Sequence, residues 1–350
     1  MAGLTVLDVR QSSTEESIRD KIIEGMCKEK KELTSLIVCS AEGLRHWDRH
    51  SADTDYYIRH EELGIFKSKA NEIASSIPDG GVVVESGSGT LENVIPMLEA
   101  LEHQEKNVTY YALDVSHSEI ASSLEVIPTE TYKHVRFGGL YGTFDDALRW
   151  LEEDPAVRDL PHCVLFLGSS IGSFSKSDAA RFLRSIATHA LKSPNSSVLV
   201  GIDGCKEPLK VLRAYTADGA RGFLMSGMDH ANAILREGHS EDETGSVPPT
   251  FDPEKWYYLT RWNRHLGRQE GSYFPRSDDV RLGPPLEHIV VKKDELVQVA
   301  VSQKYGHQER KQLFDEAGLQ EVASWSNEGC DGGQYISPYA VLYRLQPTNL

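Results

Sequence analysis

The chain has 350 residues, and its 53 acidic and 37 basic side chains give a formal net charge of −16 at pH 7. So acidic a protein lacks the basic surface that neutralises phosphates, which argues against a nucleic-acid binder and against attachment to anionic membranes. No apolar run approaches the roughly 18 residues of a membrane span, and the N-terminus shows no signal-peptide pattern. The five cysteines have neither metal-ligand nor redox spacing. We therefore expect a cytoplasmic protein.

The first 59 residues do not follow the alternation of strands and helices that builds a layered sheet. A charged segment at 16–31 carries apolar residues at helical spacing and predicts a helix. The polar stretch that follows contains His46 and His50, but it lacks the glutamate of the zinc-protease motif and shows no helical pattern. We expect both histidines in surface or capping positions, without a metal.

Apolar strands alternate with amphipathic helices through the middle of the chain. This alternation predicts a parallel sheet that is covered by helices on both faces. A helix and two strands after residue 302 would complete a seven-stranded sheet whose last strand is antiparallel. The predicted strands are 82–86, 109–114, 163–167, 197–202, 322–326 and 339–345, with a less clear one at 134–137, and the predicted helices are 59–77, 91–103, 117–124, 144–152, 176–191 and 308–317.

Residues 203–302 interrupt the alternating pattern with longer helices, loops and short strand-like runs. We predict an α/β sheet domain over 60–202 and 303–350, and an accessory substrate-binding lobe over 1–59 and 203–302. Many tryptophans and tyrosines fall in this lobe. They suit either a flat apolar substrate with a polar end or ordinary core packing.

The first predicted strand of the sheet runs into a glycine turn, Gly87-Ser88-Gly89. The next strand ends at Asp114, near the spacing of roughly 20 residues expected for a ribose-binding acid. The turn lacks the third glycine of a dinucleotide site and the lysine of a phosphate loop. It therefore fits an adenosyl ligand without a diphosphate, such as S-adenosylmethionine. The alternative is a turn that binds nothing, with Asp114 capping the next helix.

A second glycine-rich turn, Gly168 to Ser173, follows the strand at 163–167. Glycine and serine there suit the close approach of a ligand to the backbone, so we include Gly168 among the cofactor-binding candidates. The same residues have the Gly-x-Ser-x-Gly spacing of a hydrolase nucleophile turn. That alternative would leave the upstream glycine turn and Asp114 without a role.

The order of these motifs resembles the histidine-specific methyltransferase family, over roughly residues 16–345. The stretches at 141–146 and 213–219 resemble the fungal members of that family. The resemblance implies a class I, Rossmann-like methyltransferase fold that uses S-adenosylmethionine. The matching stretches are Asp55–Glu61, Glu85–Thr90, Leu113–Ser116, Phe166–Gly172, Gly201–Asp203, Ala214–Tyr215 and Val301–Tyr305.

The resemblance assigns cofactor binding to Gly87, Ser88, Gly89 and Asp114. Cys39 stands where the family usually has a tyrosine that contacts the cofactor. The departure at this position replaces a large aromatic donor by a thiol.

The resemblance also assigns the substrate head group, whose amino nitrogen accepts the methyl, to Tyr56, Ser173 and Tyr215. Ser173 replaces the asparagine of the histidine-type members. Its shorter side chain leaves room for a bridging water. No strong general base is identifiable, so we expect these three residues to act by positioning the amine.

Two further departures bear on the substrate. Ala300 stands where histidine-type members have a glutamate, two residues before Ser302, and Gly271 stands where they have a methionine. Without the glutamate, the ring N–H groups of a bound histidine would lose an acceptor. A larger and less polar pocket favours an indole with a prenyl group.

The fungal members that the chain resembles therefore imply methylation of the α-amino group of 4-dimethylallyl-L-tryptophan in ergot alkaloid synthesis. Tryptophan is an alternative substrate, and histidine, as in ergothioneine synthesis, is a less favoured one. Two other classes stay open, a nicotinamide oxidoreductase and a non-catalytic adenosyl-binding protein.

Overall fold

A computed structural model describes residues 5–11, 14–87, 91–125, 127–216, 218–236, 248–327 and 339–348. The chain divides into two compact units. The sheet unit comprises Met1–Ser12, Tyr57–Lys206 and Gln303–Leu350, and the insert unit comprises Ser13–Tyr56 and Glu207–Ser302. The predicted sheet domain and lobe have similar limits, but the N-terminal strand and residues 57–59 and 203–206, which we predicted in the lobe, belong to the sheet unit.

The sheet unit is built on a mainly parallel sheet of eight strands, so the predicted α/β fold is confirmed and the predicted count of seven is wrong. The additional strand, β1 (Thr5–Asp8), pairs in parallel with β4 at the edge of the sheet. Its four residues are too short for a periodic signal. The strand order is β1-β4-β3-β2-β5-β6-β13-β12, with β2 Val82–Ser86, β3 Val108–Asp114, β4 Val135–Tyr141, β5 His162–Phe166, β6 Ser197–Asp203, β12 Leu319–Ser326 and β13 Ala340–Pro347.

The last strand of the chain, β13, is antiparallel to both of its neighbours, β6 and β12. This agrees with the predicted antiparallel ending. Helix α10 (His307–Ala317) ends at Gly318, whose positive φ of 71° terminates the helix before β12.

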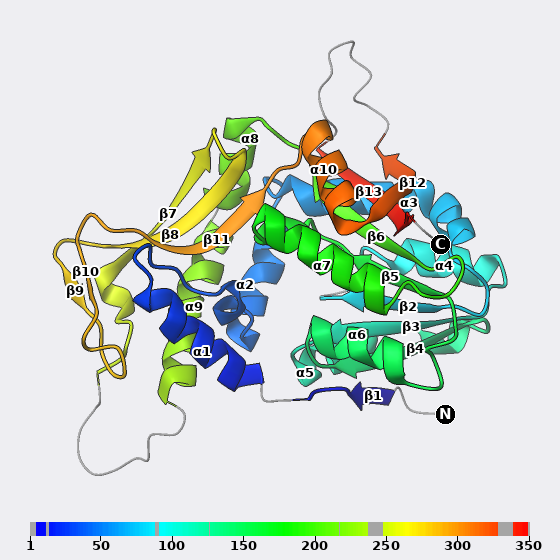
Figure 1. The fold of residues 1–350 in the computed structure, drawn as a ribbon, viewed down its shortest axis with the longest axis horizontal. Helices are drawn as coiled ribbons and strands as arrows, with labels where there is room; N and C mark the ends of the chain where they lie inside the picture. The colour runs from blue at the N-terminus through cyan, green and yellow to red at the C-terminus, as the bar shows by residue number, and fades with distance from the viewer. Residues whose placement is uncertain are drawn as a thin grey trace. The chain divides into compact units, whose positions relative to one another are not determined.

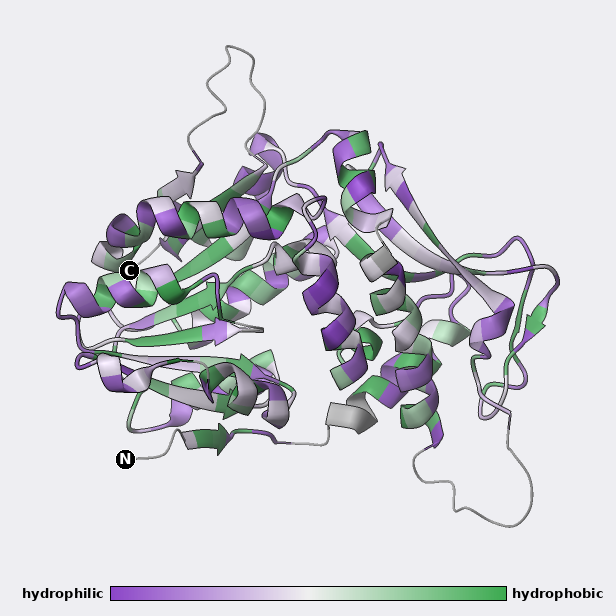
Figure 2. Cartoon of the chain, turned by 180° about the vertical axis from the view of Figure 1, so that it is seen from behind, coloured by the Kyte–Doolittle hydropathy of each residue, from purple (hydrophilic) through white to green (hydrophobic). Residues whose placement is uncertain are grey.

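Helices cover both faces of the sheet (Figure 1). Along β2, Val82 and Val84 point to one helical layer and Val83 to the other, as the two-residue period of a strand requires. Strands buried on both sides are accordingly the most hydrophobic part of this unit (Figure 2). One layer comprises α3 (Tyr57–Ser76), α4 (Ile95–His103) and α5 (His117–Glu125), and the other comprises α6 (Phe144–Glu153), α7 (Lys176–His189) and α10.

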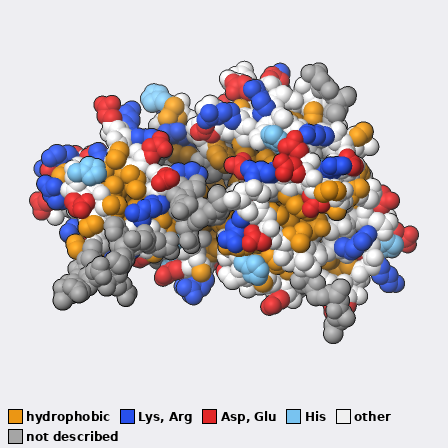
Figure 3. Space-filling model, turned by 60° about the horizontal axis from the view of Figure 1, so that its bottom comes forward, with side chains coloured by type: hydrophobic (Ala, Val, Ile, Leu, Met, Phe, Trp, Pro, Cys, Tyr) orange, Lys and Arg blue, Asp and Glu red, His pale blue; other side chains and the backbone are white. Residues whose placement is uncertain are grey.

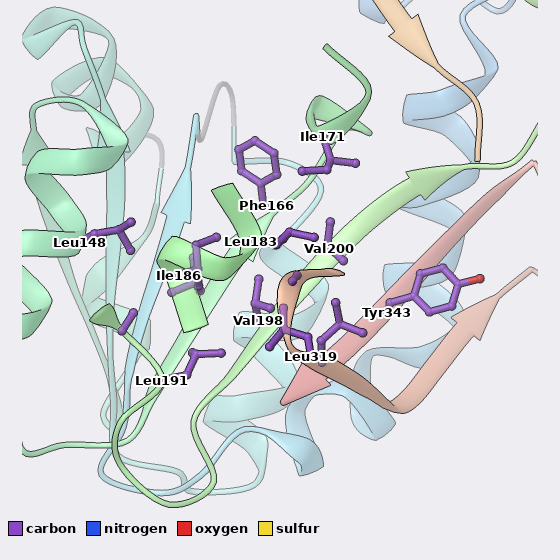
Figure 4. Close-up of a cluster of buried hydrophobic side chains, with 14 of the residues drawn as sticks. Leu148, Phe166, Ile171, Leu183, Ile186, Leu191, Val198, Val200, Leu319 and Tyr343 are labelled. Carbon is purple, nitrogen blue, oxygen red and sulfur yellow. The ribbon is translucent and has the colours of Figure 1, made fainter. Parts of the chain in front are cut away.

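Buried side chains fix the carboxyl ends of the central strands. Phe166 at the end of β5 and Ile171 just beyond it lie in the same cluster as Leu183 of α7 and Val200 of β6 (Figure 4). Burying each such side chain stabilises the fold by about 1.5–3 kcal/mol. The turns that follow these strands therefore start from a rigid base. Two short 3-10 helices, η2 (Thr129–Thr131) and η3 (Ser170–Ser173), lie in the connections.

The insert unit combines helices with a three-stranded sheet of order β11-β8-β7. Its core gathers apolar side chains of the first helix, such as Ile22 and Met26, with Met228 and Trp256. Its elements are α1 Thr14–Cys27, η1 Ser35–Val38, α2 Ala41–Ser51, α8 Pro208–Thr216, α9 Asp218–Arg236, η4 Pro253–Lys255, β7 Trp256–Asn263, β8 Arg268–Pro275, β9 Val280–Arg281, β10 Val290–Val291 and β11 Val297–Gln303.

Two elements of the insert unit were not predicted. Helix α2 forms where we expected a polar loop, because the Ser40 side chain accepts the backbone N–H of Gly43 and caps its first turn. The β7–β8 hairpin pairs Tyr258 with Tyr273 and Thr260 with Gly271. No helix within the described ranges is long and apolar enough to cross a membrane. On the face seen in Figure 3, acidic and basic side chains are interspersed.

Candidate functional site

The carboxyl ends of β2 and β3 lie side by side in the sheet unit. Gly87 follows β2, has a positive φ of 72°, and donates its N–H to the Leu113 carbonyl at 2.9 Å. Among the described residues beyond its chain neighbours, no heavy atom lies within 4 Å of the position that a Cβ on Gly87 would take. The described part of the chain thus leaves space beside this backbone, where a ligand is expected. Ser88 and Gly89, the other predicted residues of the turn, lie outside the described residues.

Asp114 is the last residue of β3, one position beyond the partner of Gly87. Its carboxylate accepts the Ser116 N–H at 2.9 Å, and burial raises the pKa of Asp114 to about 6. An anionic acceptor beside an uncovered glycine fits the ribose diol of an adenosyl group. These two residues are therefore compatible with the expected cofactor.

The helix after the glycine turn begins later than predicted. Residues 91–94 form turns, Leu91 has a positive φ of 60°, and α4 begins at Ile95 with Pro96 in its first turn. Proline is tolerated there because the first N–H groups of a helix have no internal partner. The first turn of α4 is thus separated in sequence from the glycine turn, contrary to the direct strand–turn–helix connection that we predicted.

Gly168 is engaged by a buried acid that the sequence analysis missed. Its N–H donates to both carboxylate oxygens of Glu62, at 3.0 and 2.9 Å, and Asn93 donates to the same group at 3.3 Å. The N–H of Gly168 is therefore committed to the protein itself. Glu62 lies on α3 between the buried Ile58 and Phe66. An acidic residue on an apolar face of a helix is the sequence feature that could have indicated a buried carboxyl group.

Two carboxyl groups titrate unusually in this part of the sheet unit. Burial raises the pKa of Glu62 to about 7. Burial raises the pKa of Glu85 to about 8, and the nearby Glu62 adds to the effect. The Tyr110 hydroxyl donates to Glu85. Glu85 begins one of the stretches that resemble the family, and the structure gives it a partner inside the core.

The remaining predicted positions of the sheet unit have internal contacts. Ser173 ends η3, is exposed, and donates its hydroxyl to the Ser170 carbonyl at 2.7 Å. Asp203, the end of the matching stretch Gly201–Asp203, is fully buried and accepts Lys304 Nζ and the Tyr57 hydroxyl, both at 2.5 Å. This buried ion pair holds the end of β6 in place. The Asp203 carboxylate is therefore not available to bind a ligand.

The insert unit brings together most of the predicted substrate-binding residues. The Tyr215 hydroxyl, from α8, donates to Ser302 Oγ of β11 at 2.8 Å. The Tyr56 and Tyr215 rings meet edge to face, with centroids 6.0 Å apart. We call Tyr56, Tyr215, Ser302 and the adjoining Tyr258 the tyrosine cluster. The cluster offers hydroxyl groups that can orient an amine or a carboxylate.

Gly271 and Ala300 are neighbours on adjacent strands. A Cβ on Gly271 would lie 3.4 Å from the Ala300 Cβ and 2.9 Å from the Tyr258 hydroxyl oxygen. The space expected at Gly271 is therefore partly taken by Tyr258, a residue that the sequence analysis did not assign to the site. In the structure Trp256, Tyr258 and Thr260 alternate with exposed Tyr257 and Leu259, a pattern that the residue types do not show.

An aromatic group surrounds Tyr56. The ring of Trp47 lies 5.3 Å from that of Tyr56, and the His50 ring lies 4.7 Å from it. His50 is buried, which corrects the expected surface position, and burial lowers its pKa to about 4. A Cβ on Gly219 would lie 2.9 Å from the His50 Cα, so only glycine lets α9 pack this closely. Cys39, half-buried, ends η1 in this unit.

The Rossmann-like sheet, the uncovered glycine after its first parallel strand and the acid after the next define a class I methyltransferase that depends on S-adenosylmethionine. The chain belongs to the family described as histidine-specific methyltransferase, SAM-dependent, which matches residues 18–337.

Three curated relatives cover nearly the whole chain, and each is called 4-dimethylallyltryptophan N-methyltransferase. The protein of Arthroderma benhamiae is 50% identical over 94% of this chain and 96% of its own. That of Trichophyton verrucosum is 49% identical over the same shares. That of Epichloe festucae var. lolii is 47% identical over 96% of this chain and 98% of its own.

Proposed function

We propose that this chain transfers a methyl group from S-adenosylmethionine to the α-amino nitrogen of 4-dimethylallyl-L-tryptophan, a step of ergot alkaloid synthesis. One observation carries the substrate class. Ala300 and Gly271 adjoin each other beside Tyr258, so this part of the insert unit presents a methyl group and a glycine where histidine-type members place a carboxylate and a methionine. An indole has no second ring nitrogen that would need such a carboxylate.

The names of the relatives support the same substrate. A change in specificity between enzymes of one family is made by a few side chains around the variable part of the substrate, while the scaffold is kept. Histidine is therefore the competing substrate, and a carboxylate acceptor at position 300 would be its requirement.

The chemistry needs alignment more than acid–base catalysis. S-adenosylmethionine supplies a methyl group that is already activated by its sulfonium. The amine lone pair forms the new N–C bond as the S–C bond breaks, and the nitrogen then loses a proton to water. We propose that Tyr56 and the Tyr215–Ser302 pair hold the amine in line with the methyl. Asp114 and Gly87 would hold the adenosyl part.

We also propose that the insert unit is the amino-acid-binding lobe and that the protein works in the cytoplasm. No disulfide joins the cysteines of the described residues, Cys27, Cys39, Cys163 and Cys205, which suits a reducing compartment.

The test is mass spectrometry of the purified protein with S-adenosylmethionine and an equimolar mixture of 4-dimethylallyltryptophan, tryptophan and histidine. We expect a gain of one methyl mass on the prenylated amino acid before either competitor reacts. An Asp114→Ala variant, which keeps the insert unit intact, serves as the inactive control. Preferential methylation of histidine would refute the argument from Ala300.

A further inference from the structure

Tyr258 carries a buried hydroxyl without a hydrogen-bond partner among the described residues. The residue lies on β7, directly opposite Tyr273 of β8. Its hydroxyl oxygen points toward Gly271, where a Cβ would lie 2.9 Å away, and the same Cβ would lie 3.4 Å from Ala300. The unpaired hydroxyl thus lies at the two positions where this chain departs from the histidine-type members.

An unpaired buried hydroxyl is costly to the free protein, and most such groups in native structures have a partner. Burial raises the pKa of Tyr258 and the nearby Tyr215 adds to the effect, whereas the polar side chains of Thr260 and Gln269 close to the hydroxyl act in the opposite direction without forming a hydrogen bond of good geometry. The group is consequently a neutral phenol at physiological pH. A neutral phenol can accept one hydrogen bond while it donates another. Tyr258 as a whole is only half-buried, as is Ala300 beside it, although the hydroxyl oxygen itself is buried.

The ring system of the proposed substrate contains one polar group, the indole N–H. That group is only a donor, and a bound indole leaves it buried unless the protein supplies an acceptor. Ala300 cannot act as the acceptor because it has no polar side-chain atom. Trp256 Nε1, another unpaired atom of this unit, is itself a donor. Ser302 already accepts the Tyr215 hydroxyl, so part of its acceptor capacity is in use.

We propose that Tyr258 is a specificity-determining residue whose hydroxyl oxygen accepts the indole N–H of the substrate. The side chain thereby replaces, from a different strand, the acceptor that is missing at position 300. The proposal rests on the proposed function and extends it to the recognition of the ring nitrogen.

The experiment compares the wild-type protein with Tyr258→Phe on two ligands. One ligand is 4-dimethylallyltryptophan, and the other is its benzothiophene analogue, in which sulfur replaces the indole N–H. Dissociation constants are measured by calorimetry with S-adenosylhomocysteine present, and KM and kcat are measured separately. We expect Tyr258→Phe to weaken binding of the indole about 5- to 50-fold, the cost of an unsatisfied N–H, with kcat changed less than about threefold.

The benzothiophene analogue supplies the decisive contrast. Because it has no N–H, we expect Tyr258→Phe to change its dissociation constant by less than about twofold. Equal losses on both ligands, or no loss on either while the wild type still methylates the indole, would overturn the proposal and leave the proposed function intact. Absence of turnover by the wild type on 4-dimethylallyltryptophan would overturn both.

A comparison of variants at Tyr258 and Tyr273 distinguishes a role in substrate recognition from a structural role. Tyr273, whose hydroxyl donates to the Leu224 carbonyl, is the matched control for a satisfied hydroxyl. We expect Tyr273→Phe to lower the melting temperature without changing the ratio between the two ligands. Tyr258→Phe should leave the melting temperature unchanged or raise it, because it removes an unpaired group. A lower melting temperature for Tyr258→Phe with an unchanged ligand ratio would count against the proposal.

Discussion

The affinity for S-adenosylmethionine should rise with pH through the titration of Asp114. Burial raises the pKa of this carboxyl to about 6 in the free protein. The hydroxyl groups of a ribose diol donate to the ionised carboxylate, so the ligand binds that form. Protein molecules in which Asp114 is protonated must release a proton when the ligand binds. A carboxyl with this pKa is about one-tenth ionised at pH 5 and about nine-tenths ionised at pH 7. We therefore expect the dissociation constant to fall about tenfold between these two pH values.

The assay is calorimetry with S-adenosylhomocysteine, whose own groups do not titrate between pH 5 and pH 7, in two buffers of different ionisation enthalpy. Proton release at pH 5 is then read independently of affinity. An Asp114→Asn variant keeps the shape and removes the charge. It should bind about 5- to 30-fold more weakly at pH 7, since bonds to a charged acceptor are about twice as strong as neutral ones. The affinity of Asp114→Asn for S-adenosylhomocysteine should not vary between pH 5 and pH 7.

Two results would refute this reasoning. A flat affinity of the wild type from pH 5 to pH 7 would mean that Asp114 does not accept the ligand in its ionised form. A pH dependence that survives in Asp114→Asn would assign the titration to another group. Glu62 and Glu85, with pKa values raised to about 7 and about 8, are the alternatives, and their effect would be centred at higher pH.

Three further predictions follow from the structure. Tyr215→Phe removes the donor to Ser302, so it should lower kcat about 5- to 50-fold in single-turnover assays, while calorimetry should show unchanged cofactor affinity. Ala300→Glu places a carboxylate beside Tyr258, and competition assays should show a larger kcat/KM for histidine relative to the prenylated substrate, with no change in the ratio counting against the specificity argument. Lys304→Met leaves Asp203 buried without its cation, which should cost about 3–5 kcal/mol of unfolding free energy in denaturant titrations.

The sheet unit could be predicted from the sequence because its signals are local. Strands buried on both faces are continuous apolar runs, and the order of strands and helices restricts the topology. The acid at Asp114 and the glycine at Gly87 follow directly from the ends of two such strands. Strand β1, by contrast, depends on pairing with β4 across more than 120 residues, and its four residues carry no pattern of their own.

The insert unit was predicted less completely because its contacts are not local. Helix α2 is mostly polar, and it packs against α9, which lies far from it in the sequence. His50 reads as a polar residue in a polar stretch, yet it is buried because Gly219 of α9 approaches its backbone. Glu62 was missed because it is one acidic residue on an otherwise apolar face of a helix, and the apolar residues around it determined the prediction.

The character of the site around positions 271 and 300 depends on a third residue. Two small residues, Gly271 and Ala300, predict a larger and less polar site when each is considered alone. In the folded insert unit, Tyr258 of the neighbouring strand takes part of that volume and brings a polar atom to it. The carboxylate is absent at position 300, and a neutral hydroxyl from a different strand lies beside Gly271, which is next to that position. A neutral acceptor suits one indole N–H, whereas the imidazole of histidine would lose the charge-assisted bond of a carboxylate. The absence of the acid at 300 therefore favours the indole by the kind of acceptor that remains, and not by space alone.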